Sequence, residues 1–229
     1  MSTYLNLVNK LLIKLNENEL TESNFVGVRG VYASAKDAIN DSLREIESFE
    51  QQWPYNAVEH TESLTIGTYE YAYPILFKTV DWNSFQIEKD DSLGVNSKTL
   101  KIMERDEWYK KYRDLDDDAG SDGRAIPDYV FKTHGNGYGL TPSPDQDYVL
   151  KYRYYTYFSE LTDYDDECLV PEAFNHVIIN GALKYMYVYH DNVEMANYVD
   201  DKMFQPNLKM MRKLLINDEQ YVRDTRVNF

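Results

Sequence analysis

Cysteine and long apolar runs are scarce in this sequence, and each shortage excludes a class of protein. Cys168 is the only cysteine among 229 residues, which excludes an intrachain disulfide and a thiolate metal cluster built from this chain alone. Lys10 and Lys14 interrupt the N-terminal apolar stretch, and no run approaches the roughly 20 apolar residues that span a bilayer. We therefore expect a protein made in the cytoplasm, without a signal peptide and without a membrane partner.

Basic residues are outnumbered as well. The chain has 24 Lys and Arg against 39 Asp and Glu, which gives a formal net charge of −15. Proteins that bind duplex DNA gain affinity by neutralising phosphates with Lys and Arg, so this balance argues against that class. An acidic wall would let DNA slide past without sticking, although acidity can also serve only to keep a chain soluble.

Tyrosine is the abundant aromatic residue, with 21 copies against 9 of phenylalanine, and hydrophobic residues make up 43% of the chain. This composition indicates a folded protein with a real core. A tyrosine ring is apolar with a polar tip, so it suits a surface that is wet at one stage and covered by a partner at another. Tyrosine also fills half-exposed sheet faces, and composition does not choose between the two roles.

Two amphipathic helices are predicted at the N-terminus. The first ends near Asn16 to Asn18, and its apolar positions are Leu5, Val8, Leu11, Leu12 and Leu15. The second runs from about Val28 to Glu50 and stops before Trp53-Pro54, because proline cannot continue a helix. Its apolar stripe contains small alanines that permit close packing and consists of Val31, Ala35, Ala38, Ile39, Leu43, Ile46 and Phe49.

From Glu62 the pattern changes to short aromatic and β-branched runs separated by Gly, Pro and Asn, which is typical of antiparallel sheet. One short helix is expected within this region, at about Arg105 to Leu115. The predicted strands are Ser63–Ile66, Ala72–Leu76, Ser84–Glu88, Lys98–Met103, Asp128–Lys132, Gly137–Leu140 and Asp147–Tyr155.

Helical periodicity returns after Thr162. One helix is expected from Pro171 to His190, with a buried face of Phe174, Val177, Ile178, Gly181, Ala182, Tyr185, Met186 and Tyr189. The next begins at Asp191 or Asn192, leaves Tyr198 open and buries Val193, Ala196, Val199 and Met203. Pro206 either kinks this helix or restarts it before Leu208, Met211, Leu214 and Leu215.

The order of helices, strands and helices predicts an α+β fold, in which the two ends of the chain form a helical bundle with an inserted antiparallel β subdomain. The expected boundaries are 1–56 and 163–220 for the bundle and 57–162 for the β subdomain. Residues 221–229 mix charged and aromatic side chains, and we expect an extended tail that a partner orders.

Two acidic clusters are candidates for chemistry. The first is Asp114, Asp116, Asp117, Asp118 and Asp122. An EF-hand loop starting at Asp114 would need Gly and Glu where the chain has Ala119 and Ala125, so a solvated acidic loop fits better. The second precedes a predicted helix, whose positive N-terminal end we expect it to favour, and consists of Asp163, Asp165, Asp166 and Glu167.

The remaining candidates also favour structural roles. Cys168 lies beside acidic residues that would raise its pKa, and Gly135–Gly139 lacks the phosphate-binding Lys of a nucleotide loop. This glycine-rich piece predicts a hairpin or flexible loop with positive φ at its glycines, and Thr141–Asp145 predicts a second, stiffer turn. No close ligand pair occurs among the four histidines, His60, His134, His176 and His190. Only His176 falls inside a predicted helix. The sequence therefore assigns no catalytic, cofactor-binding or metal-ligating residue.

Several short pieces occur in an order that spans most of the chain. They are Trp53-Pro54-Tyr55-Asn56, Leu64-Thr65, Tyr71 to Pro74, Asp81 to Phe85, Pro142 to Asp145, Tyr152 to Tyr155, Gly181 to Tyr185, and Asp191-Asn192. In order and texture they resemble the adaptor or head-completion proteins of tailed phages, the class that includes the tail tubular protein A type.

This resemblance implies a virion structural protein of the neck or tail, without catalytic residues or cofactors. Its partners would be the portal protein, a downstream tail protein of the nozzle or tail tube, and itself in a homo-oligomeric ring, usually of twelve copies. Genomic DNA would pass through the ring without specific binding, the helical part would meet the portal, and the β part would face the tail. By the same analogy the tail at 221–229 would dock on a neighbouring subunit or on the portal.

Two other functions stay open. One is a different neck or tail-completion protein, which its location in the virion would distinguish. The other is a soluble enzyme or a carbohydrate-binding module that uses the β insertion, whose exposed aromatic rings could stack on sugars. An enzyme should lose activity when one or two polar residues are replaced, and the sequence offers no such constellation.

Overall fold

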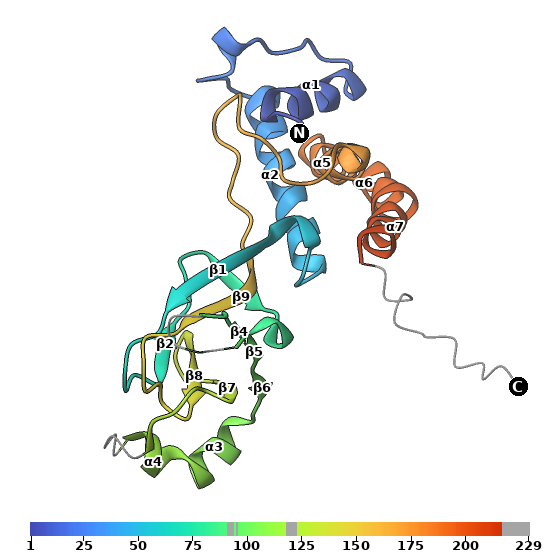
Figure 1. Ribbon diagram of the computed structural model, residues 1–229. Coiled ribbons are helices and arrows are strands. Elements are labelled where there is room, and N and C mark those ends of the chain that lie inside the picture. The colour runs from blue at the N-terminus through green and yellow to red at the C-terminus, as the bar shows by residue number, and fades with distance from the viewer. Residues whose placement is uncertain (91–93, 95, 118–122, 217–229) are drawn as a thin grey trace, which may run out of the picture. The chain divides into compact units, whose positions relative to one another are not determined.

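A computed structural model describes residues 1–90, 94, 96–117 and 123–216 of this protein. The chain forms two compact units, here called the helical unit (Met1–Asn56 with Phe158–Phe229) and the β unit (Ala57–Tyr157) (Figure 1). Helices dominate the first unit and the second contains the strands, so the predicted α+β class is confirmed. The predicted tail at 221–229 lies outside the described residues.

The helical unit begins with α1 (Tyr4–Lys14) and α2 (Val31–Phe49), which confirms both predicted N-terminal helices. The hydroxyl of Thr3 caps α1 by accepting a hydrogen bond from the Asn6 amide at 3.4 Å. Gly30 precedes α2 with a φ of +62°, a conformation that L side chains rarely adopt. The apolar stripes predicted for the two helices meet in one core, except for Phe49, which is 38% exposed. The largest fully buried side chains of this core include Trp53, Tyr4, Phe25 and Phe204.

The first and longest α-helix of the C-terminal region, α5 (Asn175–Tyr189), packs against α2. After it the chain follows one helical path through α6 (Val193–Val199), the π-helix η6 (Asp200–Phe204) and α7 (Gln205–Leu215). Pro206 lies in the first turn of α7, directly after the π-helix. Proline has no backbone N–H to donate, and its ring clashes with a carbonyl of the preceding turn in a regular α-helix. The wider π-helical turn leaves room for the ring, so the helix continues through Pro206.

Parts of the predicted burial in this region are wrong. Val193 and Tyr189 are exposed although their spacing predicted burial, and Leu214 is exposed as well. The short α6 buries a narrow line through Ala196 and Val199, so a residue one turn earlier falls outside the packed face. Tyr198 is exposed as predicted.

The β unit contains two sheets. The five-stranded sheet has β9 (Val149–Thr156) between β1 (Ala57–Ser63) on one edge and β3 (Phe77–Val80) and β4 (Gln86–Ile87) on the other, with β5 (Lys98–Thr99) beyond β4. The four-stranded sheet has the order β2 (Glu70–Ala72), β8 (Gly137–Thr141), β7 (Tyr129–Lys132) and β6 (Lys101–Ile102). The short helices α3 (Arg105–Lys111) and α4 (Arg113–Asp117) stand where one helix was predicted.

Two predicted strands are wrong in position. Ser63–Ile66 was expected to be extended, but the chain turns at Gly67, whose φ is +74°. Ala72–Leu76 fails because it contains Pro74, which cannot donate to a ladder, and Leu76, whose φ is +65°. The structure instead forms β1 upstream, where Ala57 pairs with Tyr155 and Ser63 with Val149.

The predicted strand Lys98–Met103 is divided between the two sheets. Leu100 is buried at the division, and its amide donates to the carbonyl of Phe85 at 2.9 Å. The next residue, Lys101, donates to the carbonyl of Asp128 at 2.9 Å and begins β6. β6 pairs with β7 in parallel, so the expectation of a purely antiparallel β region is wrong at this edge.

Candidate assembly surfaces

The crossing of α2 and α5 is held at close range by Gly181. A Cβ atom at this position would lie 2.2 Å from Ser42 Oγ and 2.7 Å from the nearest ring carbon of Phe204. Ser42 Oγ is itself fixed, because it donates to the Ile178 carbonyl at 2.8 Å. Only glycine therefore fits where α5 meets both α2 and η6.

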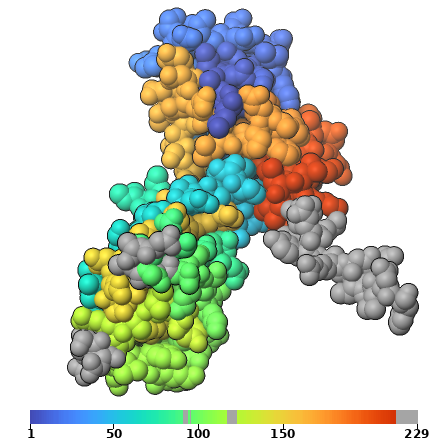
Figure 2. Space-filling view, in the orientation of Figure 1, coloured from blue at the N-terminus to red at the C-terminus, as the bar shows by residue number. Residues whose placement is uncertain are grey.

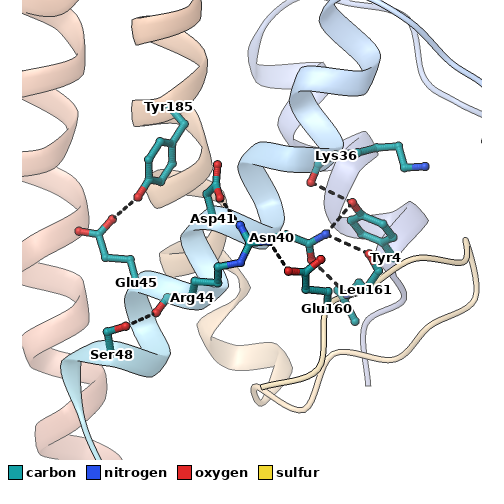
Figure 3. Close-up of polar contacts among 10 residues, drawn as sticks. All are labelled: Tyr4, Lys36, Asn40, Asp41, Arg44, Glu45, Ser48, Glu160, Leu161 and Tyr185. Carbon is teal, nitrogen blue, oxygen red and sulfur yellow. Dashed lines mark hydrogen bonds and ion pairs between the residues drawn. The ribbon is translucent and has the colours of Figure 1, made fainter. Parts of the chain in front are cut away.

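One turn further along α5, Lys184 joins the same three elements by charge. Its Nζ lies 2.5 Å from Glu45 Oε2 and 3.3 Å from Asp200 Oδ1, and stands 4.9 Å from the ring centroid of Phe204. Tyr185 adds a hydrogen bond to Glu45 Oε2 at 2.9 Å (Figure 3), and burial raises its pKa well above the ordinary value. The side chain of Lys184 is only 16% exposed, so its partners compensate for lost hydration.

The tetrapeptide Trp53-Pro54-Tyr55-Asn56 closes the end of α2. Trp53 is fully buried, and its indole N–H donates to the Ile46 carbonyl at 2.9 Å. Its ring stacks on Tyr55 with centroids 5.5 Å apart, and Asn56 Nδ2 donates to Glu47 Oε2 at 2.6 Å. The first piece of the phage-adaptor resemblance is therefore a helix-terminating device inside the helical unit.

The segment 158–170 is bound to α2 through Asn40 (Figure 3). The side chain of Asn40 makes a reciprocal pair with Leu161, accepting from its amide at 3.1 Å and donating to its carbonyl at 3.0 Å. Asn40 also donates to the hydroxyl of Tyr4, which donates to the Lys36 carbonyl. At the surface beside this pair, Arg44 of α2 contacts Asp41 and Glu160.

The second acidic cluster serves a different helix from the one predicted. Asp166 Oδ2 accepts hydrogen bonds from the amides of Thr162 and Asp163, at 2.6 and 2.8 Å, and thereby closes its own turn. These bonds hold the pKa of Asp166 below its ordinary value. The carbonyl of Asp166 accepts from the Tyr4 amide at 2.9 Å, so the cluster supports the start of α1 through its backbone.

Much of the tyrosine in the β unit belongs to the core. Tyr138, Tyr152 and Phe85 pack with ring centroids 4.6 to 5.3 Å apart, and the Tyr138 hydroxyl contacts Glu62. Burial raises the pKa of Tyr138 far above its ordinary value. This arrangement favours the second of the two roles open from composition, the filling of sheet faces, for these residues.

The glycine-rich piece is the hairpin between β7 and β8, as predicted, but its glycines have another purpose. Positive φ was expected at Gly135, Gly137 and Gly139, and none of them shows it. A Cβ at Gly137 would lie 2.2 Å from the Tyr71 carbonyl oxygen, and one at Gly139 would lie 2.2 Å from the Phe131 ring. These two glycines are required by close approach between strands and rings.

Asp116, expected in a solvated acidic loop, is buried with 3% of its surface exposed. Its carboxylate accepts three hydrogen bonds, from Trp108 Nε1 at 2.8 Å, the Ser143 amide at 2.9 Å and Ser143 Oγ at 3.0 Å. Asp116 therefore anchors the Pro142-Ser143-Pro144-Asp145 turn to α3. Asp118 and Asp122 lie outside the described residues.

Several surface pockets open on the β unit, and two of them differ in the character of their walls. The larger, of about 440 Å³, has aromatic and basic walls that include Tyr73, Phe77, Trp82 and Lys132, with no carboxylate among its described lining residues. Tyr73 and Phe77 stack on each other with centroids 3.7 Å apart, so each ring covers one face of the other. In the smaller pocket, of about 300 Å³, the Ser84 hydroxyl is engaged by the backbone carbonyl of Asp81 and the amide of Arg153.

Cys168 and the histidines lie apart from these pockets, except that His134 lines the larger one. Cys168 is buried, and burial raises the pKa of its thiol to about 11, so the direction was predicted correctly but the acidic neighbours are not its cause. His176 lies in α5, as predicted, and its Nδ1 is 3.0 Å from the Ala173 carbonyl oxygen. His60 packs against Tyr152 in the β unit.

Within the described ranges, no three His, Cys, Asp or Glu side chains come close enough to share a metal ion. The same part of the chain holds no helix that is both long and apolar enough to cross a bilayer. Its most prominent polar side chains brace helix crossings, turns and segment ends.

The comparison with known families gives the class of this protein. Residues 2–228, nearly the whole chain, match the SU10 adaptor protein family. The chain therefore belongs to this family of phage adaptor proteins, in agreement with the resemblance found in the sequence. No curated protein matches the chain.

Proposed function

We propose that this protein is a non-enzymatic subunit of the adaptor ring that connects the portal to the tail of a bacteriophage, and that the ring, usually of twelve copies, forms part of the channel through which DNA leaves. The family match over residues 2–228 carries the proposal. A ring made of one kind of subunit needs a contact between two different surfaces that closes after a fixed number of copies.

Electrostatics support the passage of DNA through such a ring. With a net charge of −15, the subunit as a whole repels phosphate, and it lacks the excess of Lys and Arg on which duplex affinity depends. DNA would therefore pass without specific binding. The protein would be made in the host cytoplasm and act in the virion, at the neck or tail.

The two units suggest a division of labour between the partners. The helical unit would bind the portal protein, and the β unit, with exposed apolar residues such as Ile75 and Leu76 on the β2–β3 connection, would face a nozzle or tail-tube protein. Ile75 is 90% exposed, which is unusual for so large an apolar side chain.

The test combines purified protein with the portal of its own phage and measures the mass of the complex, while electron microscopy locates the subunit in the virion. We expect a ring on the portal and matching density at the neck. A subunit that stays monomeric with portal, and leaves no density at the neck, would overturn the proposal. Density elsewhere in the tail would identify the alternative, a tail-completion protein.

A further inference from the structure

Positive charge in the helical unit is concentrated near its C-terminal end. Residues 202–216 contain Lys202, Lys209, Arg212 and Lys213 and no Asp or Glu, although the whole chain carries −15. On α7, Lys209 and Lys213 are exposed four residues apart, which places them on one side of the helix. Met210 and Leu214 follow them with the same spacing and are 58% and 64% exposed. These four residues are here called the basic face.

Negative charge gathers on another edge of the same unit. Residues 154–183 contain no Lys or Arg, and their exposed side chains include Glu160, Asp163 and Asp165. Asp41 of α2 adjoins them, because Arg44 contacts both Asp41 and Glu160. Asp37 lies four residues before Asp41, which places the two on the same side of α2. We call the set the acidic edge: Asp37, Asp41, Glu160, Asp163 and Asp165.

The two surfaces lie on opposite sides of the helical unit. The segment 158–170 runs beside α2 on one side, while α7 lies beyond α5 on the other (Figure 1). Hydrogen bonds fix that segment to α1 and α2, and the Arg212 to Glu50 pair, at 2.6 Å, fixes α7 to the end of α2. Figure 2 shows α7, in red, at the surface of this unit. Both surfaces are thus parts of one rigid helical framework.

We propose that the basic face of one copy docks on the acidic edge of the next copy. This inference rests on the proposed ring, and it names the surfaces that close it. Opposite charge on two different sides of one subunit gives a head-to-tail contact, which a closed ring requires and a two-fold dimer does not. Met210 and Leu214 would bury apolar surface against the half-buried Phe158 and Tyr164 of the neighbour, which stabilises the contact. A DNA phosphate offers no apolar surface and would not supply this stabilisation.

Charge reversal in two separate variants tests the contact. The first variant is Lys209→Glu with Lys213→Glu, and the second is Asp163→Lys with Asp165→Lys. In either variant alone, like charges face each other at every contact between copies, so the concentration needed for assembly on the portal should rise roughly tenfold or more. Mixed in equal amounts, the two variants can alternate around the ring, which restores opposite charges at every contact, and assembly should return.

A control and the wild type make every outcome decisive. Lys101→Glu with Lys110→Glu changes the net charge as the first variant does, but on exposed residues of the β unit, and should assemble like the wild type. Circular dichroism checks that each variant folds. If both reversed variants assemble normally, or if their mixture fails while wild type and control form rings, the docking inference is overturned and the ring survives. If wild type itself forms no ring with portal, the proposed function fails with it.

Discussion

Replacing Gly181 by alanine separates two opposing effects at the α2–α5 crossing. In an ordinary helix the change would stabilise by about 1 kcal/mol, because alanine has the higher helix propensity. Here the new Cβ would lie 2.2 Å from Ser42 Oγ and 2.7 Å from the Phe204 ring, both fully buried. Overpacking costs about 1 to 3 kcal/mol, and two blocked directions place this site near 3. We expect a net loss of about 2 kcal/mol.

Urea unfolding measures the loss as a lower midpoint with an unchanged slope. The Ser42→Ala background removes the nearest obstructing atom, so there the cost of Gly181→Ala should fall by about 1 kcal/mol. Asn197→Ala, at an exposed position of α6, serves as the control for propensity alone and should stabilise slightly. A gain of about 1 kcal/mol in Gly181→Ala would refute the close approach, since only propensity would then be acting.

Two further predictions concern carboxylates. Asp116→Asn should lower the unfolding free energy by about 1 to 3 kcal/mol in urea titrations, because an amide cannot accept from Trp108 and Ser143 at both oxygens, whereas the exposed Asp114→Asn should be neutral. Asp166 has a lowered pKa, so its stabilising effect is present above the ordinary value of 3.8 and is lost as pH falls through the lower folded value. As the pH falls through that value, hydrogen exchange at the Thr162 and Asp163 amides should therefore accelerate by more than intrinsic exchange chemistry predicts. An unchanged protection factor would contradict this. So would the same pH-dependent loss of protection in the Asp166→Asn variant, which has no carboxylate to titrate.

Helices were the most predictable part of the fold. Leu11 and Leu12 in α1, and Ala35 and Ile39 in α2, repeat at intervals that place them on one face, and that face is buried. The strand β1 was missed because its residues, from Ala57 to Ser63, alternate weakly and are mostly half-exposed or exposed. Its extended form is imposed by seven pairings with β9, a partner more than 80 residues away in the sequence.

Single polar residues were the least predictable. Asp116 belongs to a run of aspartates that is indistinguishable by composition from a solvated loop, and only the approach of the Ser143 turn makes it a buried acceptor. Likewise the spacing of Asp166 before a helix suggested α5, while the folded chain brings its carbonyl to α1. Contacts between distant segments have no local signal in the sequence.

The sequence by itself determined the α+β class, the main helices, the acidic balance and the phage-adaptor resemblance, because periodicity, composition and short motifs are local properties. Tertiary structure decided where the strands pair, that Gly137, Gly139 and Gly181 serve close approach, and that Asp116 is buried. It also placed α7 and the segment 158–170 on opposite sides of one helical unit. The physical reason is that close contact, burial and the relative direction of charges arise only when segments far apart in the chain pack together.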